Sequence, residues 1–291
     1  MNDDETAYEA LSEEIDDVRW AYGTGFTDPL SGIDASPPAD VDGAELGVYC
    51  VMLGDDALIM SHRLQEWVAR APELEEETAL ANVALDLLGQ ARLLLTRAGQ
   101  VDGTGRNEDD FAFRRDVCEF RNVRLVEGKD TDFARLIVRL FVFTTWRLAL
   151  FDRLRGSRDQ MLAAIADKGI KELTYHRDYA ADWVIRLGDG TPMSRERAQA
   201  AVDAIEPFID ELSQPTDLER RLAEVGVGID PATVRAEVED VLQKVLTIAR
   251  LHRAAHIAAR RPGRDSGHTE GMTPLLAELQ SVARAHPGAT W

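Results

Sequence analysis

The chain has 291 residues, 45% of them hydrophobic, which is enough for a packed core in one large domain or two. Its 52 acidic and 33 basic residues give a formal net charge of -19, which argues against nucleic acid as a partner because phosphate binding calls for a clustered basic face. Acid-rich, lysine-poor surfaces stay soluble by mutual repulsion that salt screens, so this halophilic composition indicates a salt-accumulating cytosol.

The cysteines and the apolar runs indicate a cytoplasmic protein. Cys50 and Cys118 cannot form a disulfide framework and fit neither a redox pair nor a zinc site, so we expect reduced thiols. The most apolar stretch, residues 136–151, is interrupted by Arg139 and Arg147, and the acidic N-terminus lacks the pattern of a secretory signal. We therefore expect no contact with a membrane.

Residues 1–44 predict an acidic N-terminal extension. Apolar residues at helical spacing over residues 5–22 indicate a helix, and residues 23–43, which are rich in Gly, Pro, Asp and Ser, indicate a loop. Residues 45–291 are expected to form the main domain.

The main domain predicts helices almost throughout, and the first two are long. A stripe of apolar residues from Leu53 to Trp67 indicates the first helix, which Pro72 should end. A run of acids directly after this proline favours the start of the second helix, because the positive end of the helix dipole attracts them. The apolar part of that helix reaches Leu95.

Two further long helices follow. Residues 133–154 are apolar nearly all round, which is typical of a helix that is covered on most sides. Ser157 and Gln160 predict a capping box at the start of the next helix. That helix should end near Leu187, where Gly188-Asp189-Gly190 turns the chain.

Additional flanking helices are predicted near Ser194, at Pro231 behind the cap Asp230, and at Pro274 behind Thr273, since proline suits the first helical position. No segment alternates with the period of two that marks a strand. The expected fold is therefore all-α, with four long helices in a bundle and satellite helices at its ends.

The histidines argue against a metal centre inside such a bundle. Bundle-core di-metal sites repeat Glu-x-x-His, which places a carboxylate and an imidazole on one helix face. None of the six histidines has a glutamate three positions before it, and only His268 has any acid there, Asp265, in a predicted loop. Signatures of a dinucleotide loop, a phosphate loop and a nucleophile elbow are absent too.

Polar residues form a line inside two of the long helices. Asn82, Asp86 and Gln90 are spaced four apart in a helix otherwise built of Leu and Ala, and Glu172 and His176 are one turn apart in another. Because buried polar groups must be hydrogen-bonded, we interpret these residues as a buried polar network that fixes the helix register.

An alternative interpretation makes Glu66, Asp86, Glu172 and His176 the ligands of two metal ions. It implies an autonomous di-metal ferritin-like oxygenase or an iron-handling protein. The third long helix, however, offers only Thr144-Thr145-Trp146 where an acid would be required. No residue is predicted to be catalytic.

A group of basic residues stands out on so acidic a chain: Arg153, Arg155 and Arg158. They could bind acidic side chains of a partner protein, or a phosphate group. A solvated helix end is the simpler interpretation.

Several sequence runs carry a resemblance to a known family. They are Leu53–Leu58, Arg63–Trp67, Ala71–Glu75, Ala79–Arg92, Ala149–Phe151, Ser157–Asp159, Ala163–Ala166, Lys171–Glu172, Tyr175–His176, His268–Glu270, Leu275–Glu278 and Trp291. Together these runs resemble the C subunits of phenylacetyl-CoA epoxidase, a ring 1,2-epoxidase and multicomponent oxygenase. The resemblance covers roughly residues 46–291, and the acidic extension has no counterpart in it.

The resemblance implies a ferritin-like bundle that lies beside a homologous catalytic A subunit. In that family the A subunit holds the di-iron centre, and the complex epoxidises the aromatic ring of phenylacetyl-CoA with oxygen. Electrons pass from NADPH through a reductase subunit that carries FAD and an iron–sulfur cluster. The resemblance further implies that this chain is a structural subunit without a cofactor or catalytic residues, and that its partners are the A, B and reductase subunits.

Overall fold

The computed structural model describes residues 30, 32–254 and 262–289, and it divides the chain into residues 1–33 and residues 34–291. The helix predicted over residues 5–22 lies outside the described residues, as does the first part of the loop predicted after it. From residue 34 to residue 42 the chain has only turns, bends and irregular structure, as the Gly- and Pro-rich composition predicts.

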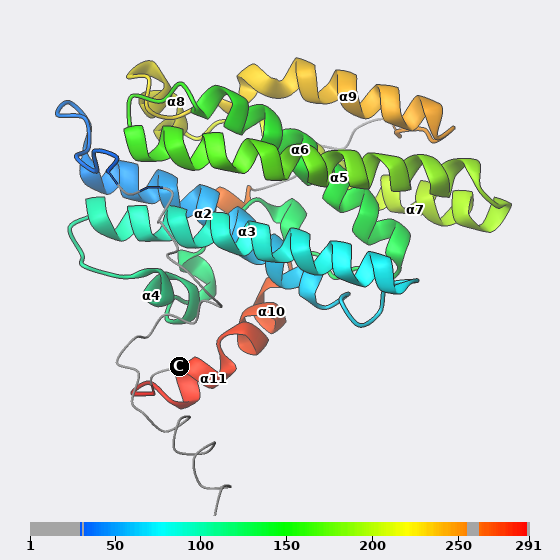
Figure 1. Ribbon diagram of the computed structural model, residues 1–291, viewed down its shortest axis with the longest axis horizontal. Helices are drawn as coiled ribbons and strands as arrows, with labels where there is room; N and C mark the ends of the chain where they lie inside the picture. Colours follow the sequence, from blue (N-terminus) through cyan, green and yellow to red (C-terminus); the bar gives the residue numbers. More distant parts are fainter. Residues whose placement is uncertain (1–29, 31, 255–261, 290–291) are drawn as a thin grey trace, which may run out of the picture. The chain divides into compact units, whose positions relative to one another are not determined.

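Four long helices form the centre of residues 34–291 (Figure 1). They are α2 (Gly43–Gln65), α3 (Leu74–Val101), α5 (Phe133–Leu154) and α6 (Gln160–Asp189). Helix α2 packs mainly on α3, α5 packs mainly on α6, and α3 runs antiparallel beside α6. The described residues contain no strand, so the predicted all-α ferritin-like bundle is confirmed.

Shorter helices flank the bundle. They are α4 (Glu108–Phe113), η1 (Val117–Glu119), η2 (Arg124–Val126), α7 (Pro192–Ile209), η3 (Asp210–Ser213), α8 (Asp217–Glu224), η4 (Pro231–Val234), α9 (Arg235–Ile248), η5 (Gly263–Asp265), α10 (Met272–Leu279) and α11 (Ser281–Ala285). Helices α7 and α9 pack on α5 and α6, whereas α10 contacts η1. This cover explains why α5 is apolar on nearly all sides.

Two helix ends differ from the prediction. Helix α2 stops at Gln65, well before Pro72, because the Trp67 N–H bonds to the Leu64 carbonyl in a tighter turn. Trp67 is buried and holds this turn in place. Helix α10 begins at Met272 with Gly271 at its N-cap, so the prediction that Thr273 caps it is wrong.

The start of α6 also differs from the prediction, because its N-cap is Asp159. The Asp159 carboxylate accepts a hydrogen bond from the Leu162 N–H at 2.8 Å and forms a buried ion pair with Arg97 of α3. The Ser157 hydroxyl instead donates to the Val227 carbonyl at 2.7 Å. The predicted Ser157 capping box is therefore wrong, whereas the predicted cap Asp230, which accepts from the Ala232 N–H, is confirmed.

Candidate functional site at the bundle centre

A buried guanidinium lies among the four long helices. Arg147, in α5, has no exposed surface. Its Nε donates to the Gln90 Oε1 of α3 at 2.9 Å, and its Nη1 donates to the Leu53 carbonyl of α2 at 3.1 Å. The guanidinium also lies over the Phe151 ring, 4.4 Å from the ring centroid. Burial lowers the pKa of Arg147 to about 10, so the side chain stays charged at neutral pH.

Gln90 extends this network from α3 to α6. Its Nε2 donates to the Glu172 Oε2 at 2.9 Å, and Lys168, one turn earlier in α6, donates to the Glu172 Oε1 at 2.8 Å. The side chain of Glu172 is 18% exposed and that of Lys168 is 40% exposed. A continuous chain of hydrogen bonds therefore runs from the buried Arg147 to the surface, with contributions from all four long helices.

His176 and Asp86 form a second link between α3 and α6. The fully buried His176 places its Nε2 3.0 Å from the Asp86 Oδ2, and the Asp86 side chain is 40% exposed. Burial lowers the pKa of His176, although the bond to Asp86 opposes this shift. A neutral ring that donates from Nε2 leaves only a lone pair at Nδ1, which has no hydrogen-bond partner among the described residues.

Two residues that the sequence placed in the polar network or among the candidate metal ligands, Asn82 and Glu66, do not lie at the contact between α3 and α6. Asn82 is exposed on α3, so the prediction that it belongs to the buried network is wrong. Glu66 follows the end of α2 and is ion-paired with Arg63, whose guanidinium also donates to the Glu127 and Gly271 carbonyls. The structure thus brings Asp86, Gln90, Glu172 and His176 to the contact between α3 and α6, but it does not bring Asn82 or Glu66 there.

The residues at the bundle centre do not fit a di-metal site. Such a site needs carboxylates from facing helices around two cations, whereas α5 contributes the cation Arg147 here. Glu172 and His176 are each engaged by a protein partner. Within the described parts of the chain, no group of three or more His, Cys, Asp or Glu side chains is placed to hold a metal ion. The permanent charge of Arg147 would also repel a divalent cation in this poorly solvated space.

Buried ion pairs around this centre could not be found from the sequence. Asp56 of α2 accepts from the Arg264 Nη2 at 2.9 Å, and its neighbour Asp55 forms a buried pair with Arg115. Both aspartates have no exposed surface. The partners are far away in the sequence, so no spacing could reveal them. The one hint of buried ion pairs in the sequence is the adjacent pair of aspartates itself, which interrupts the apolar stripe of α2.

A buried carboxyl just after α7 predicts how stability depends on pH. The Glu211 Oε1 accepts from the Gly263 N–H at 2.7 Å and from the Arg124 N–H at 3.2 Å, and burial raises its pKa from 4.5 to about 7. The folded protein then binds a proton that the unfolded chain releases, so stability falls as pH rises from 4.5 to about 7. At about 1.4 kcal/mol per pKa unit, the full loss is about 3 kcal/mol.

We expect Glu211→Gln to remove most of this fall, because an amide does not titrate and can still accept through its oxygen. Urea unfolding followed at a series of pH values across this window would measure it. Glu224→Gln, the same change at an exposed position, is the matched control and should keep the wild-type slope. Equal slopes in both variants would contradict the assignment to Glu211.

Comparison with known proteins identifies the family. The family model described as "Phenylacetic acid catabolic protein" matches residues 34–291. The chain belongs to this family. It is 42% identical over 247 residues to the C subunit of the 1,2-phenylacetyl-CoA epoxidase of Escherichia coli (strain K12), and the match covers 85% of this chain and 99% of that protein. The resemblance seen in the sequence runs is thereby confirmed, and the relative is by its name one component of a multi-subunit epoxidase.

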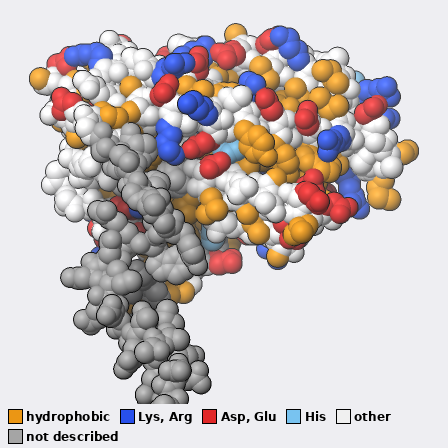
Figure 2. Space-filling model, in the orientation of Figure 1, with side chains coloured by type: hydrophobic (Ala, Val, Ile, Leu, Met, Phe, Trp, Pro, Cys, Tyr) orange, Lys and Arg blue, Asp and Glu red, His pale blue; other side chains and the backbone are white. Residues whose placement is uncertain are grey.

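In this member of the phenylacetic acid catabolic protein family, the outer surface of α3 and α6 is apolar and exposed. We call it the α3–α6 face and define it by Leu85, Asp86, Tyr175 and Tyr179. Leu85 is 62% exposed and Tyr175 is 56% exposed, and the Tyr175 and Tyr179 rings stack with centroids 6.4 Å apart. Figure 2 shows apolar side chains gathered where these two helices run side by side.

The composition of α3 strengthens this observation. By length and apolarity α3 could cross a membrane, a test that core helices of soluble proteins also pass, and only 44% of its most apolar window is buried. From Thr78 to Ala91 its one charged residue is Asp86. Within the described residues, more than half of that window is therefore incompletely buried, and Leu85 is its most exposed large apolar side chain. Large exposed apolar patches mark interaction surfaces.

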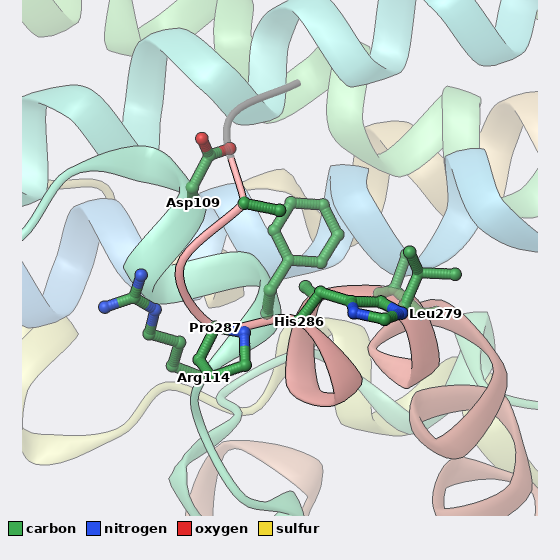
Figure 3. Close-up of a pocket in the computed structure, with 9 residues that line it drawn as sticks. Asp109, Arg114, Leu279, His286 and Pro287 are labelled. Carbon is green, nitrogen blue, oxygen red and sulfur yellow. The ribbon is translucent and has the colours of Figure 1, made fainter.

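A pocket near the C-terminus offers no comparable chemistry. It lies between α4 and α11, and Figure 3 shows Asp109, Arg114 and His286 around it. Arg114 is ion-paired with Asp110 at 3.1 Å, and the pocket has no nucleophile beside a base. We therefore do not regard it as an active site of this family member.

Proposed function

We propose that this chain is the non-catalytic structural subunit of a phenylacetyl-CoA 1,2-epoxidase, and that it supports a di-iron catalytic A subunit in aerobic phenylacetate degradation. The observation that carries this proposal is Arg147. It puts a fixed guanidinium among the helices that would have to surround two metal ions, and it binds α2 and α3 directly. The family and the name of the relative support the choice of reaction.

Under this proposal the cofactors belong to other subunits. The di-iron centre resides in the A subunit, and FAD and an iron–sulfur cluster reside in the reductase subunit. This chain carries no cofactor and contributes no catalytic residue. The complex, which also contains a B subunit, works in the cytoplasm without nucleic acid or a membrane.

The A subunit binds the α3–α6 face. Burying Leu85 and Tyr175 removes apolar area from water, which contributes roughly 25 cal/mol per Å². A second copy of this chain is a poorer occupant, because it would bring a second net charge of -19 against the first. Lys171, which is exposed one turn before Tyr175 in α6, would meet acids on the A subunit.

The fixed charge at the centre also suits a supporting role. A catalytic bundle needs ordered surroundings for its metal ligands, and a neighbouring bundle whose helices are tied together by Arg147 and Gln90 supplies a rigid surface. The α3–α6 face lies beside that network, because its member Asp86 contacts His176, which is one turn from Glu172 in α6.

Co-expression with the A subunit tests the proposal. At the salt concentration of the native cytosol the two chains should elute together from a sizing column, and iron should follow the A subunit. This chain purified alone should contain no stoichiometric iron. Separate elution of the two chains, or oxygen-dependent turnover by this chain with its own iron, would overturn the proposal.

A further inference from the structure

A basic cavity interrupts the acidic chain near the start of α5, the helix that also carries Arg147. It has a volume of about 500 Å³ and lies among η2, the start of α5, the end of α7 and the segment 268–271. Four cationic side chains line it: Arg124, Lys129, Arg135 and Arg139. Glu270 is the one acid among the lining residues that the structure describes. In a chain of net charge -19, this is a local reversal of sign.

Arg139 forms the buried end of the cavity. Its residue is 1% exposed, and it is ion-paired through Nη2 with Asp130. Its Nε and Nη1 have no hydrogen-bond partner in the described part of the chain. A buried guanidinium with unused N–H groups is costly, so an acceptor that enters the cavity would be bound strongly.

Gly128 leaves this guanidinium uncovered. A Cβ atom at Gly128 would lie 3.7 Å from the Arg139 Nη1 and 3.9 Å from its Cζ, so a larger side chain there would lie against the guanidinium. At the mouth, Lys129 is exposed and Arg135 is half-buried, and neither has an ion-pair partner among the residues that the structure describes. The cavity thus has one buried and two accessible cations that can meet the same ligand.

Asp130 and Glu127, which lie close to the buried end of the cavity, are already engaged by other groups. Asp130 pairs with Arg139, and the Glu127 carboxylate accepts from the Asn122 side chain and the Thr269 N–H and also contacts the His268 ring. Neither leaves a carboxylate in the cavity to neutralise Lys129 or Arg135. Four cationic side chains against the single lining acid Glu270 therefore leave the cavity with a net positive charge.

The arginines that stood out in the sequence do not form such a site. Arg153 is ion-paired with Glu237 at 2.9 Å and Arg158 with Asp40 at 2.8 Å. Arg155 lies 3.5 Å from Asp167. Each of these exposed arginines has an acid partner within the chain, which leaves the cavity as the better place for an anion.

We propose that this cavity is a binding site for a phosphate monoester, and that it takes the 3′-phosphate of the coenzyme A thioester. The assignment to coenzyme A rests on the proposed function, whereas the phosphate-binding site itself does not. Arginine donates two parallel hydrogen bonds to phosphate oxygens, and lysine adds a point charge. The cavity has room for a phosphate group and part of a nucleoside, and the rest of the thioester would extend outside it.

Calorimetric titration of the full chain with coenzyme A, dephospho-coenzyme A and inorganic phosphate tests both parts. We expect coenzyme A to bind at least about tenfold more tightly than dephospho-coenzyme A, which lacks the 3′-phosphate. Arg135→Gln and Lys129→Gln should each weaken binding of coenzyme A about tenfold or more. Both side chains are free of internal ion pairs among the described residues, so these variants should fold normally, and unfolding curves would check this.

Arg155→Gln is the matched control, because it removes one exposed arginine outside the cavity. Equal binding of coenzyme A by the wild type, Arg135→Gln and Lys129→Gln, or no binding of any of the three ligands, would overturn the anion site. Phosphate binding that depends on Arg135, with no preference for coenzyme A, would support the anion site and overturn its assignment to the thioester. None of these results bears on complex formation with the A subunit, which tests the proposed function separately.

Discussion

Replacing Arg147 by methionine should lower the free energy of unfolding by about 3–5 kcal/mol, the range for removing one partner from a buried charged network. Methionine has a similar length and would fill most of the space. The loss of stability would therefore have two sources. The Gln90 Oε1 and the Leu53 carbonyl would each lose the hydrogen bond that Arg147 donates, and the buried Asp56 carboxylate would lose the attraction of the nearby positive charge. For a protein of this size the melting temperature should fall by roughly 6–20 °C.

Thermal and urea unfolding at one fixed salt concentration would measure this effect. Arg92→Met is the matched control, because the Arg92 side chain is 68% exposed and lies 3.6 Å from its acid partner Glu108. An exposed substitution of this kind should change stability by no more than about 0.5 kcal/mol. If the two variants were equally stable, Arg147 would not be the link that joins the helices.

The helices could be predicted from the sequence because their signals are local. The predicted helix over residues 133–154 coincides with α5, since its apolar run is bounded by the Asp132 cap and by Arg155. Acids after Pro72 likewise predicted the start of α3. Caps were less reliable, because Ser157 and Asp159 both have the right chemistry and only the tertiary partner Arg97 decides between them.

Asn82 shows why the polar line could be predicted only in part. Successive residues of a helix are rotated by about 100°, so positions four apart drift by about 40°. Asn82 and Gln90 therefore point about 80° apart on α3, which is enough to place Gln90 in the centre and Asn82 in solvent. Spacing alone does not tell which end of such a line faces the neighbouring helix.

Arg147 could be located in the sequence but not interpreted. It interrupts an apolar stretch, and an arginine in that position is compatible with several environments. Its partners Leu53 and Gln90 lie in two other helices, so their proximity depends on how α2, α3 and α5 pack. The same holds for the basic cavity, where Arg139 meets the segment 268–271 only in the folded chain.

Charge placed on the α3–α6 face should prevent assembly with the A subunit without unfolding this chain. We expect the double variant Leu85→Asp with Tyr175→Asp to raise the dissociation constant of the complex by roughly 100-fold or more, because the two aspartates would become buried without partners in the interface. Since they are 62% and 56% exposed, the isolated variant should unfold like the wild type.

Ile248→Asp is the matched control, an equally drastic change at an apolar residue that is 59% exposed at the end of α9. Binding to the A subunit, measured by titration at the native salt concentration, should not change in this variant. The comparison separates a specific interface from general loss of solubility, because both variants add acids to an exposed apolar surface.

If Ile248→Asp weakened the complex as much as the double variant, the A subunit would bind a surface other than α3 and α6. If neither did, the apolar face would have another occupant, and self-association of this chain at high salt would be the next measurement, since salt screens the repulsion between two acidic copies.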